Sequence, residues 1–161
     1  MRDDDVVGLV GEVPTAHGRR WAVWTPDGLV AMHRSRDVAL RHAAAAGVPD
    51  ACPAGRGATA PAHPDWARLP GGFRGRVLRA CHAIPSGQVA TYGDLARAAG
   101  SPGAARAVGS AMGANPLAPV IPCHRVVRSD GTLGQYTSGG ASVKARMLRA
   151  EGVRIRNGRI V

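Results

Sequence analysis

The sequence predicts an α+β protein in two parts, a small N-terminal antiparallel-sheet domain and a mostly helical C-terminal domain that carries a helix-turn-helix. Three observations predict this division. Strand-like apolar runs fill residues 7–33, residues 48–64 are rich in Pro, Gly and Ala without periodicity, and the helical patterns gather later in the chain. The middle stretch is interpreted as a linker, which gives a scaffold domain with its linker over residues 1–64 and a second domain over 65–161.

The first part reads as strands followed by one helix. Thr25-Pro26-Asp27-Gly28 separates two apolar runs, and its Pro and Gly stand where a tight turn needs them. A helix is expected from about Asp37 until Gly47 stops it. Trp21 and Trp24 are interpreted as core residues, because no chemical motif is found around them.

The second part opens with a helix in which Phe73, Val77 and Cys81 recur at helical spacing, so Cys81 is expected to be a buried core thiol. A turn and a short extended piece follow over residues 85–91. Thr91 with Asp94 three residues later is a capping-box pattern, which predicts the start of a second helix.

A helix-turn-helix is predicted where this helix meets the next one. Gly100 closes the first of the two helices. Ser101 is expected to be the N-cap of the following helix, with Pro102 at its first position. Two short helices joined by such a tight turn are the arrangement that places a recognition helix against DNA.

That following helix presents an unusually thin surface. Val108 and Met112, four residues apart, can anchor one face in the core, and Arg106 is its only long polar side chain. A helix that accepts glycine loses stability, which is acceptable where another backbone must come close. Tight packing against the rest of the domain, with Arg106 in solvent, explains the pattern equally well. The small residues are Ala104, Ala105, Ala107, Gly109, Ser110, Ala111 and Gly113.

Charge and cysteine content restrict the class of protein. The net charge of +10 favours a polyanionic partner, with nucleic acid ahead of a membrane surface. All but one of the basic residues are arginine, which is also what a biased genome composition produces. Three cysteines without a CxxC pair do not form a disulfide framework and fit a reducing cytosol. An acidic start without a signal peptide, and no long apolar run, predict a soluble cytoplasmic protein.

The stretch "VIPCHRVVRSD" raises a chemical question, because Cys123 and His124 stand side by side after Pro122. Cys123 could be a packed structural thiol or a nucleophile; a metal site lacks further ligands at recognisable spacing. In an extended segment neighbouring side chains point to opposite faces, so His124 would need a turn at Pro122 or a bridging water to act on the thiol. Asp130 and Glu151 are the candidate carboxylates that could orient the imidazole.

Five motifs in this order carry a resemblance to a known family: "TYGDLARAAG", "ARAVGSAMGANP", "IPCHRVV", "LGQYTSGG" and "LRAEG". Over residues 73–152 the sequence resembles the O6-alkylguanine-DNA alkyltransferases, the methylated-DNA–protein-cysteine methyltransferases. The resemblance implies a winged-helix-like helix-turn-helix and direct-reversal DNA repair. An alkyl (methyl) group would pass irreversibly from O6 of guanine in duplex DNA to Cys123, one turnover per molecule, with no cofactor and no metal.

The resemblance also implies the catalytic roles. Cys123 would be the acceptor thiolate, and His124 would be the base that acts on it through a water. Glu151 would hold the other nitrogen of the imidazole. Asn115, eight residues before Cys123, would brace the turn between the recognition helix and the active-site segment.

For DNA binding, the resemblance implies that the target base leaves the duplex, since a thiolate cannot reach it inside the stack. Arg106 would fill the space left by the rotated base, and Tyr92 would push on the adjacent phosphate. Ser101, Ala107 and Gly109 complete the expected DNA-binding set.

The implied substrate pocket has Met112 and Tyr136 as walls. Ser138 would hydrogen-bond the purine O6, and the backbone carbonyl of Val126, with that of Cys123, would read the amino edge. This sequence places Thr137 between Tyr136 and Ser138, where many family members have Tyr-Ser directly.

The expected partner is double-stranded DNA bearing O6-alkylguanine, with no membrane involved, and the protein is expected to be a monomer that can bind DNA cooperatively. A non-enzymatic lesion-binding sensor of the same fold is the alternative function, and such relatives lack the acceptor cysteine. A helix-turn-helix regulator would need a dimerisation or effector module, and a thiol hydrolase would show multiple turnovers.

Overall fold

The computed structural model describes most of the chain, namely residues 8–15, 18–49, 51–54 and 59–161. The acidic start on which the expected absence of a signal peptide depends lies largely outside these described residues. The chain forms two compact units: Met1–Pro70 with Pro116–Val120, and Gly71–Asn115 with Ile121–Val161. The α+β class is confirmed, with a sheet in the first unit and most of the helices in the second.

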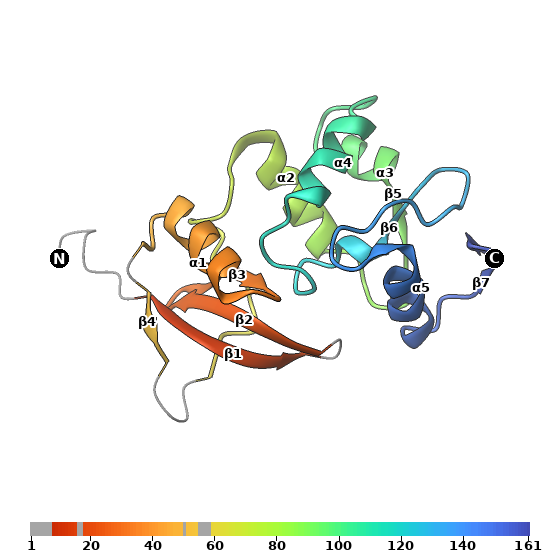
Figure 1. Cartoon of the computed structure of the whole chain (residues 1–161). Coiled ribbons are helices and arrows are strands. Elements are labelled where there is room, and N and C mark those ends of the chain that lie inside the picture. The colour runs from red at the N-terminus through yellow and green to blue at the C-terminus, as the bar shows by residue number, and fades with distance from the viewer. Residues whose placement is uncertain (1–7, 16–17, 50, 55–58) are drawn as a thin grey trace. The chain divides into compact units, whose positions relative to one another are not determined.

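The sheet of the first unit has the strand order β3-β2-β1-β4 (Figure 1). Strands β1 (Leu9–Thr15), β2 (Gly18–Thr25) and β3 (Gly28–His33) pair antiparallel along the chain. The predicted turn between the last two is confirmed. Gly28 has φ +142°, and a Cβ there would come within 2.7 Å of the Asp65 backbone nitrogen, so no other residue fits.

Strand β4 (Cys52–Pro53) lies inside the stretch interpreted as a linker, so that interpretation is wrong at this point. It pairs in parallel with β1 through Cys52 N–H to the Gly8 carbonyl, 2.9 Å, and Ala54 N–H to the Val10 carbonyl, 2.8 Å. Pro53 between them needs no N–H, because the strand is at the edge of the sheet. The proline-rich composition concealed an edge strand.

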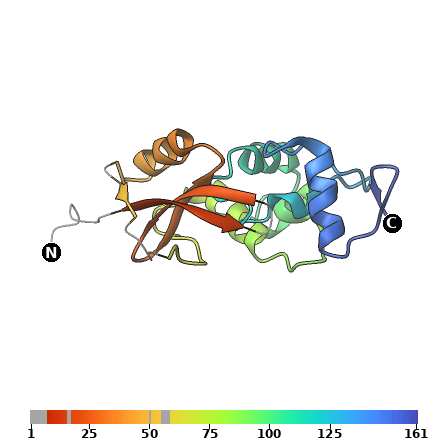
Figure 2. The ribbon, with the colours of Figure 1, turned by 60° about the horizontal axis from the view of Figure 1, so that its bottom comes forward.

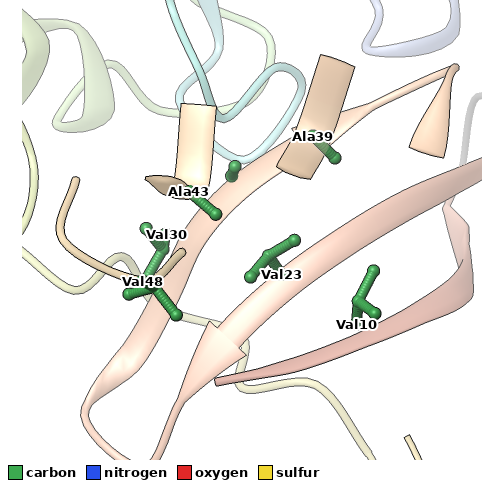
Figure 3. Packing of buried hydrophobic residues seen from close by; sticks show 7 residues of the cluster. Val10, Val23, Val30, Ala39, Ala43 and Val48 are labelled. Carbon is green, nitrogen blue, oxygen red and sulfur yellow. The ribbon is translucent and has the colours of Figure 1, made fainter. Parts of the chain in front are cut away.

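Helix α1 (Arg36–Ala45) covers one face of this sheet (Figure 2). Its small buried side chains let the helix approach the strands closely, and Figure 3 shows them over the apolar side chains of the sheet. Gly47, with φ +80°, follows the helix as predicted. Trp24 is buried, and Trp21 packs at the edge of the core. The core consists of Val10, Val23, Val30, Ala31, Ala39, Ala43 and Val48.

One segment from the second half of the chain belongs to this first unit. The Met32 N–H of β3 donates a 2.7 Å hydrogen bond to the Pro116 carbonyl, and Leu117 is fully buried. The segment Pro116–Val120 leads directly to the cysteine-histidine pair. The first unit therefore includes a segment from the second half of the chain, which its own sequence does not reveal.

In the second unit, helices α2 (Gly72–His82), α3 (Tyr92–Ala98) and α4 (Ala105–Gly113) pack against one another (Figure 1). Cys81 is fully buried on α2, which confirms the expectation of a core thiol. Helices α3 and α4 are consecutive and form the predicted helix-turn-helix.

The capping box at the start of α3 is confirmed. The Thr91 hydroxyl accepts from the Asp94 N–H at 3.0 Å, and the Asp94 carboxylate accepts from the Thr91 N–H at 2.8 Å. Gly100 follows α3 with φ +71°, as expected for a helix-ending glycine.

The predicted N-cap of α4 is wrong. Ser101, Pro102, Gly103 and Ala104 form a β-turn, closed by a 3.1 Å bond from the Ala104 N–H to the Ser101 carbonyl. Pro at the second position and Gly with φ +89° at the third favour a type II turn over a helical start. Ala104, which has no capping side chain, is the N-cap instead.

After α4 the chain forms a short 3₁₀ turn, η2 (Cys123–Arg125), and then strand β6 (Val126–Val127). Strand β6 pairs in parallel with β5 (Ala90–Thr91), which immediately precedes α3. The cysteine-histidine pair and the helix-turn-helix are therefore joined by backbone hydrogen bonds.

The chain ends with helix α5 (Gly140–Ala150) and a hairpin of β7 (Ile155–Arg156) and β8 (Arg159–Ile160). Their apolar side chains join a second core cluster around Val127, Leu133, Leu148 and Val153. Across the described residues, no helix has both the length and the apolar character that a membrane span requires.

The cap of α3 can be tested by removing its acceptor. Thr91→Ala is expected to lower the free energy of unfolding by about 1 kcal/mol, measured by urea denaturation. Ser101→Ala is the matched control, because Ser101 caps neither helix, and it should change the unfolding free energy by less than about 0.5 kcal/mol. A loss at Ser101 equal to that at Thr91 would restore Ser101 as a cap.

Candidate active site

Cys123 begins the 3₁₀ turn η2, directly after Pro122. The Cys123 N–H donates to the Ile121 carbonyl at 2.8 Å, and the Arg125 N–H donates to the Pro122 carbonyl at 2.9 Å. Cys123 is 6% exposed and His124 is 1% exposed. In an extended backbone the two side chains would point to opposite faces. The 3₁₀ turn after Pro122 replaces that backbone, so a turn at Pro122, one of the two possibilities considered, is present.

His124 is oriented by a carboxylate from a distant part of the chain. Its Nε2 lies 2.8 Å from Oε1 of Glu151, the residue that ends α5. An ionised carboxylate only accepts hydrogen bonds, so the neutral imidazole carries its proton on Nε2. Its buried Nδ1 then carries the lone pair, and this is the nitrogen able to take a proton from a thiol. Of the two candidate carboxylates, Asp130 and Glu151, it is therefore Glu151 that orients the imidazole.

Arg125 also binds Glu151, which the sequence patterns did not indicate. Its Nε and one terminal nitrogen each donate to the carboxylate at 2.9 Å, and the other donates to the Ile84 carbonyl at 2.6 Å. Burial alone would raise the pKa of Glu151, but hydrogen bonds from Arg125 and His124 outweigh it and hold the pKa at about 2. Glu151 is therefore ionised at neutral pH.

Asn115 braces the same region from the other side. Its amide nitrogen donates to the Ile121 carbonyl at 2.8 Å, and the side chain is 6% exposed. Asn115 follows α4 and Ile121 precedes the cysteine, so this bond fixes the position of η2 relative to the helix-turn-helix. The same side chain hydrogen-bonds the Cys123 thiol.

The environment of Cys123 favours the protonated thiol at rest. Burial raises the pKa of Cys123 above its usual range. The hydrogen bond from Asn115, the Lys144 charge and nearby backbone N–H groups oppose this increase without cancelling it. A nucleophilic reaction at this sulfur therefore requires a base.

Lys144 is the residue that sequence reasoning missed. It is the only lysine in the chain, and it is fully buried on α5. Its Nζ donates to the Val126 carbonyl at 2.5 Å, and its charge acts on both Cys123 and Cys81. Burial lowers the pKa of Lys144 to about 8. In the sequence, Lys144 stands at helical spacing from Met147 and Leu148, and this pattern could have indicated that the lysine is buried.

An open cavity of about 590 Å³ lies beside Cys123, within the size range of small-molecule sites. The residues that line it come from α3, α4, η2 and the loop between β6 and α5. They are Tyr92, Gly93, Ala105, Arg106, Gly109, Met112, Gly113, Cys123, Arg128, Ser129, Asp130, Gln135, Tyr136 and Thr137.

Most of the expected DNA-binding and pocket residues meet at this cavity. Four of them, Ser101, Ala107, Val126 and Ser138, do not line it. Val126 is buried in β6, where its carbonyl accepts from Lys144, and Thr137 lines the cavity in place of Ser138. Asn115 supports the site from behind, whereas Ser101 lies in the turn before α4 and Ala107 is exposed on α4. In the described part of the chain, no group of His, Cys, Asp and Glu has the arrangement of a metal site.

Helix α4 forms one wall of the cavity, and the structure distinguishes the two interpretations of its small residues. Val108, Ala111 and Met112 face the core, whereas Arg106 and Ala107 are exposed. A Cβ built on Gly109 would meet no atom within 4 Å. Packing inside the protein therefore does not explain this glycine.

Comparison with known proteins places the second unit in a characterised group. The family model described as 6-O-methylguanine DNA methyltransferase, DNA binding domain, matches residues 72–153. The methylated-DNA–protein-cysteine methyltransferase of Salmonella typhimurium is 55% identical over 80 residues, which are 50% of this chain and 46% of that protein. The protein of the same name from Mus musculus is 53% identical over 70 residues, which are 44% and 33%. The chain spans about half the length of the curated relatives it matches, or less.

The similarity to solved structures extends over both units. A crystal structure of Mycobacterium tuberculosis OGT in complex with DNA superimposes with a TM-score of 0.59 and 28% sequence identity. The superposition covers 91% of this chain and 93% of that one.

The cluster of Glu151 with His124 and Arg125 predicts how the stability of the fold changes at acid pH. The pKa of Glu151 is about 2 instead of 4.5, so ionised Glu151 stabilises the fold above pH 4.5 and loses this effect as the pH falls towards 2. The shift corresponds to at most about 3 kcal/mol. Glu151→Gln should lower the unfolding free energy at pH 7 and flatten its decline between pH 4.5 and 2, measured by urea denaturation.

Glu12→Gln is the matched control for this experiment, because Glu12 makes an exposed ion pair with Arg19. It should leave the acid dependence close to that of the wild type. If Glu151→Gln and the wild type lost stability in parallel below pH 4.5, the account of the cluster would be wrong.

Lys144 predicts a second rise of stability with pH, in the alkaline range. Its pKa is about 8 when folded against 10.5 ordinarily, so the unfolded chain binds more protons between these values and stability rises with pH there. The unfolding free energy of the wild type minus that of Lys144→Met should increase by about 3 kcal/mol from pH 8 to pH 10.5. Taking the difference removes the titration of groups that do not interact with Lys144, such as the exposed tyrosines of the unfolded chain; a flat difference would contradict the prediction.

Proposed function

The chain belongs to the 6-O-methylguanine DNA methyltransferase family, and we propose that it repairs DNA by direct reversal. In this proposal Cys123 accepts an alkyl group, methyl above all, from O6 of guanine in duplex DNA. The transfer is irreversible and each molecule acts once, as a methylated-DNA–[protein]-cysteine S-methyltransferase. No cofactor takes part.

One observation carries the proposal: a nearly buried thiol lines a cavity whose wall is the second helix of a helix-turn-helix. Behind the thiol stands an imidazole oriented by an ionised carboxylate. A hydrolase could use the same thiol and base, but it would not need the cavity to open beside a thin helix carrying Arg106. The combination suits a base delivered from DNA.

The proposed chemistry is a single displacement. His124 takes the proton of the Cys123 thiol through a water, with Glu151 stabilising the imidazolium that forms. The sulfur then attacks the alkyl carbon, a new S–C bond forms, and the C–O6 bond breaks with its electron pair left on the guanine. The thioether product has no leaving group that water can displace, so the reaction stops after one event.

The departing guanine needs a proton, and Tyr92 is placed to supply it. It lines the same cavity as Cys123, and burial raises the pKa of its hydroxyl. The hydroxyl therefore keeps its proton at neutral pH and can donate it to the base. This role is compatible with the expected contact of Tyr92 with the adjacent phosphate.

Reaction inside the cavity requires the guanine to rotate out of the duplex. Arg106 stands exposed on α4 at the cavity, where its side chain can fill the place that the base leaves. The neighbouring small residues of α4 allow the minor groove to approach without collision. Met112 and Tyr136 line the cavity and would hold the purine.

The contact to the purine O6 is assigned to residues 137–138. Thr137 lines the cavity and directly follows Tyr136. We therefore propose that either the backbone N–H or the hydroxyl of Thr137 donates to the purine O6, in addition to Ser138. The carbonyls of Cys123 and Val126 remain proposed partners of the amino edge, and the second lone pair of the Val126 carbonyl is available beside the bond from Lys144.

Duplex DNA bearing O6-alkylguanine is the proposed partner. We expect the protein to act in the cytoplasm as a monomer that can bind DNA cooperatively. The high arginine content supports a polyanionic partner, because guanidinium groups pair well with phosphates.

The proposal is tested by intact-protein mass spectrometry after incubation with a duplex that carries one O6-methylguanine. We expect a gain of one methyl group, located on Cys123 by peptide mapping, that stops at one equivalent. Cys123→Ala should show no gain while binding the duplex as well as the wild type. Binding without methyl transfer by the wild type would refute the transferase and leave a lesion sensor.

Gly109 gives a second prediction, in which stability and function change in opposite directions. Gly109→Ala is expected to raise the free energy of unfolding by about 1 kcal/mol, because alanine favours the helix. The added methyl would stand between α4 and the duplex, so the Kd for lesion-free duplex should rise by about tenfold, equivalent to about 1.4 kcal/mol.

Gly113→Ala is the matched control in the same helix, since its methyl would face Thr137, whose Cγ2 lies 3.8 Å away. Fluorescence anisotropy with a labelled duplex gives the Kd of each variant. Unchanged duplex binding by Gly109→Ala would mean that α4 does not approach DNA at this residue.

A further inference from the structure

The C-terminal hairpin is a short, well-defined ribbon (Figure 1). Ile155 pairs with Ile160 and Arg156 with Arg159, and the turn between them is Asn157-Gly158 with φ angles of 49° and 73°. Two consecutive positive φ angles are the mark of a type I′ turn, whose twist matches that of the strands. The ribbon therefore holds its side chains in fixed directions.

The two faces of the ribbon differ completely in character. Ile155 and Ile160 turn inwards and pack against the second core cluster. Arg156 and Arg159 are exposed on the opposite face, and Arg154 follows the same alternation. A bond from the Val161 N–H to the Arg154 carbonyl, 3.1 Å, extends the ladder to that residue. We call these three arginines the ribbon arginines.

This arrangement is electrostatically unfavourable by itself. The side chains of a directly opposed pair start about 5 Å apart, and like charges in such positions repel. Over residues 130–161 the acidic residues are Asp130, whose charge acts on Arg159, and Glu151, which His124 and Arg125 occupy. No carboxylate among the described residues forms a salt bridge with a ribbon arginine. An external anion would remove the repulsion.

The ribbon is attached to the loop that borders the cavity. A terminal nitrogen of Arg159 donates to the Asp130 carbonyl at 3.1 Å, and the Ile160 N–H donates to the Gly131 carbonyl at 3.0 Å. The nearby Asp130 carboxylate is engaged by the Thr132 N–H and hydroxyl. Asp130 and Arg128 of this loop line the cavity. The ribbon arginines are thus adjacent to the loop that lines the cavity beside Cys123.

From these observations we infer that the ribbon arginines bind the phosphate backbone of the duplex whose base enters the cavity. This inference rests on the proposed function and extends its DNA contact beyond the helix-turn-helix. Guanidinium groups on a rigid ribbon match phosphate oxygens in geometry and charge. Contacts to phosphates carry no sequence information, which suits a protein that must act wherever a lesion occurs.

The salt dependence of binding to lesion-free duplex tests this inference. Each phosphate contact contributes about 0.9 to the slope of log K against log salt concentration. The variant R156Q/R159Q should reduce that slope by about 1 to 2 and weaken binding several-fold near ~0.1 M salt. Loss of Arg159 also removes its hydrogen bond to the Asp130 carbonyl, which could impair folding of the first variant. The variant R154Q/R156Q keeps this bond, and it should reduce the slope by a similar amount.

R146Q/R149Q is the matched control, because it removes two exposed arginines from α5 with the same change of charge. Its slope should stay close to that of the wild type. An unchanged slope in both ribbon variants, or an equal reduction in the control, would overturn the inference.

Methyl transfer from a free O6-alkylguanine base separates this inference from the proposed function. The ribbon variants should react with the free base at the wild-type rate, because the cavity and Cys123 are unaltered. If the wild type itself transferred no alkyl group, the proposed function would fail, while the salt slopes would still decide whether the ribbon binds phosphates.

Discussion

The partly buried carboxylate of Glu151, whose side chain is 11% exposed, is the constraint on which the site depends. It lies at the end of α5 and accepts hydrogen bonds from His124 and Arg125, two consecutive residues of the turn that holds the thiol. Arg125 continues to the Ile84 carbonyl, just after α2. A charge in such a place must be fully paired, because removing one partner leaves the other uncompensated. Three segments distant in sequence are therefore held together, and the imidazole has one orientation.

The surroundings of Cys123 determine how readily its thiol ionises beside the His124–Arg125–Glu151 cluster. Burial keeps the Cys123 thiol protonated, while Asn115 and Lys144 make its ionised form less costly. Such a thiol is unreactive until a base removes its proton. Cys81 is fully buried and burial raises its pKa as well, but it does not line the cavity and is a core thiol. Helix α4 adds one wall of the cavity, and the residues that it contributes there are mostly small.

The sequence predicted those features that depend on local chemistry. The hairpin at Pro26–Gly28, the capping box of Thr91 and the helix-ending Gly100 all follow from neighbouring residues. The N-cap of α4 was misassigned because Pro102-Gly103 supports a turn as readily as a helical start. Strand β4, the bond from Met32 to Pro116, the pairing of Arg125 and the burial of Lys144 arise from contacts between distant segments. No pattern within one segment reveals such contacts.

The burial of the only lysine has a consequence for the rest of the surface. Every basic side chain exposed in the described part of the chain is arginine or histidine. Guanidinium groups keep their charge at any pH that the fold survives. The positive charge that arginine gives this surface is thus nearly constant from neutral to alkaline pH, whereas the single lysine, whose pKa is about 8, loses its charge inside the protein.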